Sequence, residues 1–190
     1  MRPGLVIIVL WIGFAASWIL AAAWSDKTAK SVGIRDEIGY RALQLLGWIL
    51  LAVPAHGYVG PLRLWQVTWA EAWVCVALIA LGLAFSWWAR IYLGPLWSSQ
   101  VTRKINHRIV DSGPYAVVRH PIYTGVLLAA YATSAAKGTV PGVAAALLIT
   151  LAFWLKARLE ERWLSEELGP DEYQAYRRKV PMLLPFGPKA

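Results

Sequence analysis

Residues Leu5–Trp24 read LVIIVLWIGFAASWILAAAW, a run of 20 residues without a charged side chain. An α-helix rises about 1.5 Å per residue, so this run is long enough to cross a hydrocarbon core of about 30 Å. A signal peptide is the alternative, because Arg2 precedes the run and alanines occupy positions 21–23. Four basic residues follow between positions 27 and 41, and such a pattern disfavours export. The run is therefore interpreted as a first membrane-spanning helix.

The composition of the chain also indicates a membrane protein. Of the 190 residues, 58% are hydrophobic and only 16% are charged, which is more apolar than a water-soluble surface of this size tolerates. The 12 Trp residues are typical of membrane interfaces, although some of them could line a pocket. The single cysteine, Cys75, excludes an intramolecular disulfide and a cysteine-based metal site, and no metal is expected.

The net charge of +8 does not indicate nucleic-acid binding. The basic residues lie between the apolar runs and form no continuous binding segment. Anionic lipid head groups are the expected counter-charge. No obligate protein partner is evident from the sequence.

Four further apolar segments predict helices at about 42–58, 72–89, 122–136 and 139–155. Only Lys137 and Gly138 separate the last two, which predicts an antiparallel hairpin. Both are shorter than an ideal span, so they either cross a locally thinned bilayer or stop short and pack against the other helices. The predicted fold is all-α: a single polytopic membrane domain, residues 1–190, with about five transmembrane helices.

The distribution of Lys and Arg predicts the orientation of these helices. With five spans, one side of the membrane receives Arg2, Arg63 and Lys137, and the other side receives the remaining 16 of the 19 basic residues. The positive-inside rule then places the N-terminus outside and the C-terminus in the cytoplasm. Most polar side chains fall in two cytoplasmic segments, 90–121 and 156–190, where we expect the chemistry. The Ala-rich and Trp-rich composition suggests a bacterial inner membrane.

Both cytoplasmic segments contain residue types that bind charged groups. Arg119 and His120 precede Pro121, and a helix start with free N–H groups and a partial positive charge suits a carboxylate or phosphate. The alternative is that both residues only anchor the helix at head groups. In the second segment Lys156 and Glu160 share a helix face, which makes either a surface ion pair or part of a site for a cationic cofactor group. These residues alone leave an enzyme and a lipid-binding module open.

Two separated motifs resemble the isoprenylcysteine carboxyl methyltransferase family, which includes bacterial members and is related to phospholipid N-methyltransferases. The first comprises Ser112-Gly113-Pro114-Tyr115 and Arg119-His120-Pro121-Ile122-Tyr123-Thr124-Gly125; the second comprises Glu160-Glu161, Gly169, Tyr173, Tyr176, Val180-Pro181 and Leu184-Pro185. The resemblance covers about residues 90–185. It implies methyl transfer from S-adenosylmethionine, with the cofactor between the start of the fourth helix and the helix that carries the two glutamates.

The resemblance also implies roles for individual residues. Cofactor contacts are implied at Gln100, His107, Arg108, Ile109, Val110, Tyr115, His120, Pro121, Ile122, Tyr123 and Glu160. The substrate-binding arginine of the family falls on Lys156, which lacks the bidentate fork that grips a carboxylate. Arg158 could take that role, and Arg119 is a further candidate for binding the substrate.

The expected acceptor is lipophilic and enters sideways from the bilayer. A carboxylate acceptor is already ionised at neutral pH and needs a cation to orient it but no general base. With an amine or thiol acceptor a proton would have to leave, and His107, His120 or Tyr123 would be candidate bases. Two alternatives belong to other classes: an NADPH-dependent membrane reductase, and a non-catalytic protein for lipid binding or assembly.

Overall fold

The computed structural model describes residues 2–24, 28–31, 33–54, 60–97, 102–104, 109–168 and 170–189. Along the chain the elements are α1 (Pro3–Ala22), β1 (Thr28–Ser31), α2 (Ile34–Ala52), the 3-10 turn η2 (Gly60–Leu62), α3 (Trp69–Leu93), η3 (Gly94–Leu96), β2 (Thr102–Lys104), η4 (Gly113–Ala116), α4 (Pro121–Lys137), α5 (Val140–Leu168) and α6 (Pro170–Lys179). β1 and β2 form a short antiparallel pair. Helices dominate the rest, so the predicted all-α class is confirmed.

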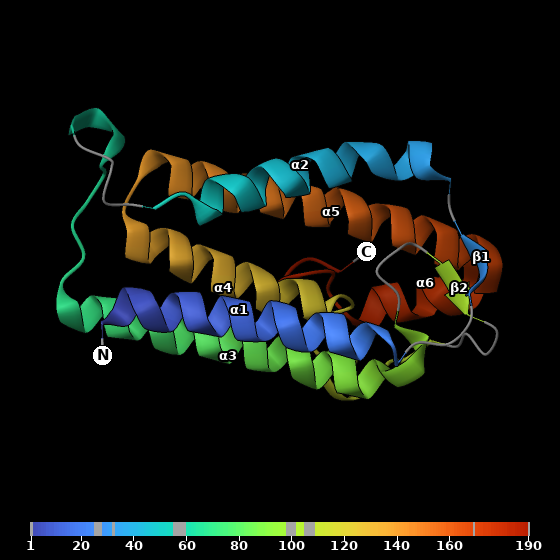
Figure 1. Cartoon of the computed structure of the whole chain (residues 1–190). Helices are drawn as coiled ribbons and strands as arrows, with labels where there is room; N and C mark the ends of the chain where they lie inside the picture. Colours follow the sequence, from blue (N-terminus) through green and yellow to red (C-terminus); the bar gives the residue numbers. More distant parts are fainter. Residues whose placement is uncertain are drawn as a thin grey trace.

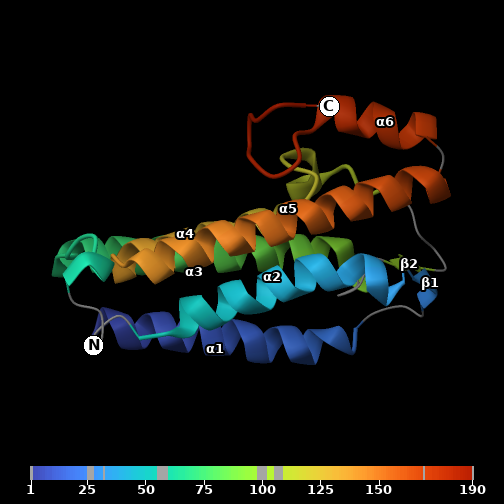
Figure 2. The same cartoon turned by 90° about the horizontal axis from the view of Figure 1, so that it is seen from above.

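Five long helices lie side by side and alternate in direction (Figures 1 and 2). α3 packs along α4, α2 along α5, α4 along α5 and α1 along α3. The ends of α1, α3 and α5 lie where α2 and α4 begin, and α6 and the β1–β2 pair lie at this same end of the bundle (Figure 1). We call it the α6 end. The opposite end, where Gly138 joins α4 to α5, is the hairpin end.

The surface of the bundle is suited to lipid. α1 buries none of its residues, and large apolar side chains such as Ile12, Ile19 and Leu20 are exposed along it. Within the described residues, three helical stretches are long and apolar enough to cross a membrane: α1, α3 with its following turn, and Val140–Glu166 within α5. α4 has only 17 residues, and α2 begins with several charged side chains. The count of five spans therefore stays a prediction.

Two helices, α2 and α5, differ most from their predicted ranges. α2 begins at Ile34 rather than near residue 42. A prediction from hydropathy excludes charged residues, whereas the first turns of this helix contain charged residues that stabilise it. Glu37 lies near the positive end of the helix dipole and forms an ion pair with Arg41 one turn later. α2 ends at Ala52, shortly before Pro54. α5 continues beyond residue 155 as far as Leu168 and so carries both glutamates on an unbroken helix.

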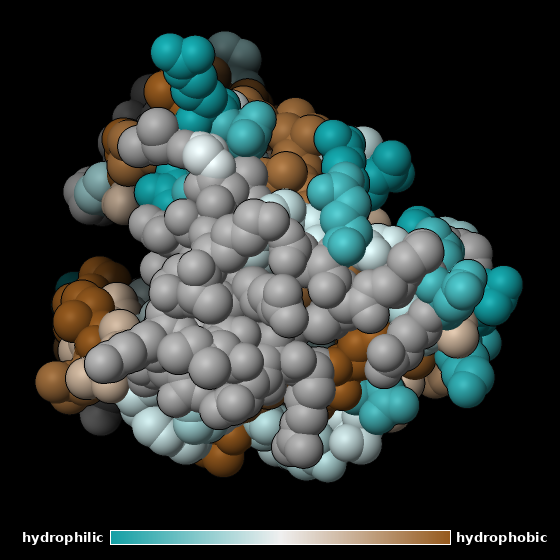
Figure 3. All heavy atoms as spheres, turned by 90° about the vertical axis from the view of Figure 1, so that its right-hand side faces the viewer, coloured by the Kyte–Doolittle hydropathy of each residue, from teal (hydrophilic) through white to brown (hydrophobic). Residues whose placement is uncertain are grey.

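Three of the basic residues that the structure describes, Arg2, Arg63 and Lys137, lie at the hairpin end. Lys137 donates hydrogen bonds to the carbonyls of Leu51 and Val53 at the hairpin end. Arg63 forms an isolated bridge with Thr139 there, and Arg2 begins α1 at the same end. Figure 3 looks onto the α6 end, where hydrophilic side chains lie along the top and the right of the view and hydrophobic ones at the left. The membrane side that each end faces stays a prediction.

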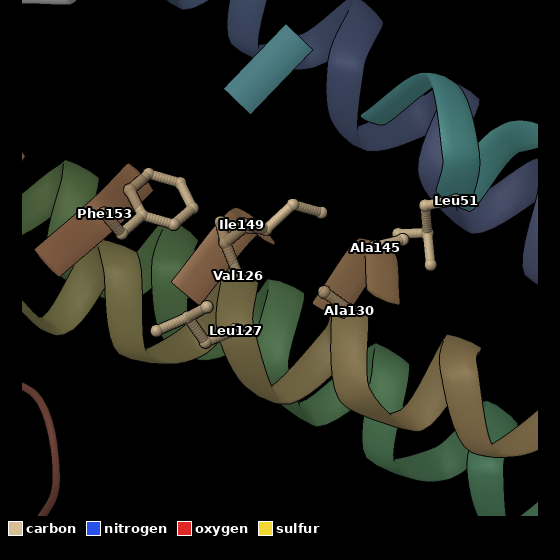
Figure 4. Packing of buried hydrophobic residues seen from close by; sticks show 7 residues of the cluster. All are labelled: Leu51, Val126, Leu127, Ala130, Ala145, Ile149 and Phe153. Atoms are coloured by element: carbon tan, nitrogen blue, oxygen red, sulfur yellow. The ribbon is translucent and has the colours of Figure 1, made fainter. Parts of the chain in front are cut away.

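Close helix packing fixes where α4 lies. Gly82 on α3 and Gly125 on α4 face each other: a Cβ on Gly82 would lie 2.5 Å from the Gly125 carbonyl oxygen, and a Cβ on Gly125 would lie 2.3 Å from that of Gly82. Small residues allow this approach between helices in a membrane. On its other side α4 packs with α2 and α5 in an apolar core that includes Leu51, Val126 and Ile149 (Figure 4). The start of α4 is thereby held beside the polar half of α5.

Candidate active site

Glu160 on α5 is the centre of a polar cluster at the α6 end. The hydroxyl of Tyr123 on α4 donates a hydrogen bond to Glu160 Oε1 at 2.7 Å. His120 Nδ1 lies 3.5 Å from Glu160 Oε2, and Lys156 Nζ lies 3.9 Å from Oε1. The Glu160 side chain retains 18% of its surface exposed. The Glu160 side chain is therefore fixed in position and partly exposed.

Aromatic rings surround this carboxylate. The rings of His120 and Tyr123 are stacked with centroids 5.3 Å apart, and Tyr123 stacks on Phe153 at 4.6 Å. The Lys156 ammonium lies over two tyrosine rings, 5.3 Å from the centroid of Tyr123 and 5.9 Å from that of Tyr40 on α2. Aromatic faces attract cations, as carboxylates do. The cluster thus combines one negative group, one positive group and ring faces within a few ångströms.

Glu161 serves a separate group of partners. Consecutive residues on an α-helix point about 100° apart, so Glu161 turns from the Glu160 cluster toward α6. Arg119 Nε donates to its Oε1 at 2.7 Å, and Arg177 Nε on α6 lies 3.4 Å from Oε2. His120 Nε2 lies 3.2 Å from Oε1, which leaves His120 between both carboxylates. Glu161 joins α5 to α6 and to the segment before α4.

The segment after α6 is fastened to the start of α4. The backbone N–H groups of Arg119 and His120 donate to the carbonyls of Pro181 and Met182 at 2.9 and 3.1 Å. Thr124 Oγ1 donates to the Leu183 carbonyl at 2.6 Å. Figure 2 shows the chain folding back from α6 along the side of the bundle. The C-terminal segment is thereby a wall of the site.

Burial and ion pairing act in opposite directions on His120. Burial, the largest single cause, lowers the pKa of the imidazole, but the hydrogen bonds to Glu160 and Glu161 and the charges of these carboxylates together raise it above the ordinary histidine value. Burial also raises the pKa of Tyr115 and Tyr176, whose phenols stay protonated. His120 thus lies between two carboxylates, both of which favour its protonated form.

The structure brings four of the predicted site residues together: His120, Tyr123, Lys156 and Glu160. Other predicted contacts lie around them as supporting structure. Tyr115 is buried, and its carbonyl accepts a hydrogen bond from Tyr176. Pro121 is the first residue of α4, and the carbonyl of Ile122 accepts a hydrogen bond from Ser86. Ile109 packs on the apolar cluster of Tyr173, Tyr176 and Val180, and the next residue, Val110, is half-buried. Gln100, His107 and Arg108 lie outside the described residues.

The three predicted substrate-binding residues lie in different surroundings. Lys156 is buried beside Glu160. Arg158 is exposed, with its guanidinium 5.2 Å from the Trp154 ring and directed to the outer groove between α5 and α6. Each guanidinium nitrogen of Arg119 is bonded to Glu161 or to the carbonyls of Arg177 and Val180. Any substrate contact by Arg119 would have to compete with these bonds.

Sequence reasoning missed Tyr40 and Arg90, which shape this end of the bundle, and it named Glu161 only as part of the second motif, without a role of its own. Arg90 is fully buried and donates to the carbonyls of Ala21, Trp24 and Gly94, which fastens the end of α1 to α3. Because Glu161 follows Glu160 directly on a helix, its side chain was expected to point in a different direction from that of Glu160. Nothing in the spacing of Tyr40 or Arg90 indicated their partners, because these contacts span helices far apart in the sequence.

The residues present fit the cofactor that the motif resemblance implies. S-adenosylmethionine carries a sulfonium and an ammonium group, both cationic. Glu160 offers a carboxylate on a partly exposed side chain, and the stacked rings of His120 and Tyr123 offer faces beside it. Lys156, on the α2 side of Glu160, offers a positive charge suited to an anion.

Comparison with known proteins gives a consistent family. The sequence model of the family described as phospholipid methyltransferase matches residues 70–171, more than half of the chain. The chain is 35% identical over 106 residues to a protein-S-isoprenylcysteine O-methyltransferase of Schizosaccharomyces pombe, covering 53% of this chain and 43% of that protein. It is 31% identical over 120 residues to the cobalt-zinc-cadmium resistance protein CzcN of Cupriavidus metallidurans, covering 62% of this chain and 53% of that protein.

A third relative acts on a different acceptor. The chain is 45% identical over 71 residues to methanethiol S-methyltransferase 2 of Bradyrhizobium diazoefficiens, which is 37% of this chain and 26% of that protein. The chain spans about half the length, or less, of these relatives. The predicted resemblance to the isoprenylcysteine carboxyl methyltransferases is confirmed, and the chain belongs to the phospholipid methyltransferase family.

Proposed function

We propose that the chain is a membrane methyltransferase that uses S-adenosylmethionine and methylates a lipophilic acceptor bearing an anionic group. The observation that carries the proposal is the Glu160 carboxylate, fixed by Tyr123 and His120 and partly exposed. Relatives named as O- and S-methyltransferases support the same reaction class. In this proposal Glu160, His120 and Tyr123 hold the cationic cofactor, and Arg119 and Glu161 position them.

An anionic acceptor suits the charges of the site. When bound, S-adenosylmethionine supplies an electrophilic methyl group whose bonding electron pair stays on the sulfur, so an ionised acceptor gains the methyl group without losing a proton. Lys156 is the cation within reach of the Glu160 cluster, and it would orient a carboxylate or a thiolate. A carboxylate of the isoprenylcysteine type is our first choice. A thiol is the second, because a relative is named for methanethiol.

The acceptor is proposed to reach the site from the bilayer at the cytoplasmic face of a bacterial inner membrane. Supporting this orientation, the polar cluster and α6 lie at one end, while Arg2, Arg63 and Lys137 lie at the other. The aromatic walls formed by Tyr123 and Phe153 suit an apolar chain beside the polar head. The five-span arrangement belongs to the same proposal.

The test uses the full chain purified in detergent or nanodiscs. Isothermal titration with S-adenosylmethionine and, separately, with NADPH is expected to show micromolar binding of the first alone. Transfer of labelled methyl groups is then measured into an isoprenylcysteine, into methanethiol and into a total lipid extract. Binding of NADPH alone would favour a membrane reductase, and binding of neither would leave a non-catalytic lipid-binding protein.

Lys156 and Arg158, both predicted to bind the substrate, lie in different surroundings and are therefore expected to contribute differently. Lys156→Met is expected to raise the KM for the acceptor at least tenfold, because a charge-assisted contact contributes about 1.5–3 kcal/mol. Its effect on the Kd of S-adenosylmethionine should be smaller. Arg158→Met is the matched control, two residues along the same helix and exposed, and should leave both values within about twofold. The opposite ranking would assign acceptor binding to Arg158.

A further inference from the structure

Tyr40 on α2 has a buried hydroxyl without a partner. The residue is only 4% exposed, and within the described residues its hydroxyl meets the geometry of no hydrogen bond, although Glu37 and Arg41 lie close to it on the same helix. A buried hydroxyl that loses its water and gains no partner costs about 1–3 kcal/mol. Such groups in folded proteins call for an explanation, and an absent ligand is one of them.

The surroundings of Tyr40 indicate what that ligand is. Its ring centroid lies 5.9 Å from Lys156 Nζ, and the same ammonium lies 5.3 Å from the Tyr123 ring and 3.9 Å from Glu160 Oε1. Tyr40 therefore borders the proposed site across the cation that would orient the acceptor. α2 packs along α5 at this point, which fixes Tyr40 relative to Lys156.

Tyr40 also comes from a part of the chain that the family match does not cover. The match begins at residue 70, within α3, whereas Tyr40 lies on α2. The contacts attributed to the cofactor, from Gln100 to Glu160, all come later in the chain. An element outside the matched region is well placed to differ between family members that use different acceptors.

We propose that Tyr40 binds the methyl acceptor, its hydroxyl donating a hydrogen bond to the same anionic group that Lys156 pairs with. This inference rests on the proposed function and names a residue that determines acceptor specificity. The ligand is a carboxylate or thiolate at the head of an apolar molecule. The ring of Tyr40 packs between α2 and α5 and contributes to folding, whereas the hydroxyl contributes to recognition.

If the ring contributes to folding and the hydroxyl to recognition, Tyr40→Phe should weaken acceptor binding without lowering stability. Tyr40→Phe keeps the ring and removes only the hydroxyl, so the apparent Tm should stay the same or rise, because an unpaired polar group leaves the interior. The Kd of an isoprenylcysteine and that of methanethiol, each measured without S-adenosylmethionine, are expected to rise about tenfold for whichever the protein binds. The KM for that acceptor should rise in parallel, with kcat and the Kd of S-adenosylmethionine nearly unchanged.

Tyr131→Phe is the matched control. Tyr131 lies on α4, is exposed, and accepts a hydrogen bond from Thr150 instead of facing Lys156. It should leave acceptor binding unchanged. A fall in Tm with unchanged acceptor affinity in Tyr40→Phe would make the hydroxyl structural and overturn the inference.

The inference and the proposed function fail in different ways. If the wild-type chain binds S-adenosylmethionine and an acceptor, and Tyr40→Phe binds that acceptor equally well, only the role of Tyr40 is rejected. If the wild-type chain binds neither acceptor, the anionic-acceptor proposal is rejected together with the role of Tyr40.

Discussion

Glu160→Gln is expected to weaken the binding of S-adenosylmethionine by about 10- to 100-fold. The substitution keeps the size of the side chain and removes the charge that would pair with a cationic group, and such charge-assisted contacts contribute about 1.5–3 kcal/mol. The remaining ring faces of His120 and Tyr123 would retain part of the affinity. The measurement is isothermal titration of the purified variant.

Glu166→Gln provides the control for this experiment. Glu166 lies six residues further along α5, is exposed, and borders the outer groove with Arg162 and Arg177 instead of the Glu160 cluster. Its affinity for S-adenosylmethionine should match that of the wild type. Equal affinities for wild type and Glu160→Gln would remove Glu160 from the cofactor site.

Arg119→Met is expected to give the largest loss of stability. The side chains of Arg119 and Glu161 are each only 3% exposed, and the guanidinium also bonds the carbonyls of Arg177 and Val180. Removing one member of a buried ion pair costs about 3–5 kcal/mol, because the other charge is left buried. For a chain of this size that corresponds to a fall in Tm of about 10 °C, measured by thermal unfolding in detergent.

A double variant distinguishes the loss of stability that comes from breaking the ion pair from the loss that comes from removing the other contacts of Arg119. Arg119→Met combined with Glu161→Leu should recover part of the stability, because no carboxylate is then left buried with only His120 and Arg177 as partners. Arg178→Met, at an exposed position on α6, should change the free energy of unfolding by less than about 0.5 kcal/mol. If Arg119→Met is as stable as this control, the pair does not hold the C-terminal segment in place.

The meeting of Tyr123 and Glu160 was predictable from the chain. A two-residue connection at Lys137 and Gly138 requires α4 and α5 to run antiparallel, so the start of one and the later half of the other share an end. The motif resemblance then assigned both residues to one site, and the structure places them in hydrogen-bonding contact. Local sequence signals were sufficient here, because an antiparallel hairpin brings the start of α4 and the later half of α5 to the same end.

Other features depend on tertiary partners that no local pattern encodes. Arg119 was predicted to bind the substrate because a basic residue at a helix start suits an anion, yet a carboxylate 42 positions away engages it. The start of α2 was predicted too late, because hydropathy penalises the charged residues that stabilise a helix N-terminus. Tyr40 gave no signal, since its relation to Lys156 arises only when α2 packs along α5.

Under the proposed function, the helices that hold the methyl donor are distinct from α2, which borders the methyl acceptor. The close Gly82–Gly125 contact joins α3 to α4, and both lie within the region shared with the family. α2 lies outside that region and borders Lys156 from the opposite side. Under the proposed function, a lineage could exchange one methyl acceptor for another by altering α2 alone, while the machinery that retains the donor is inherited unchanged.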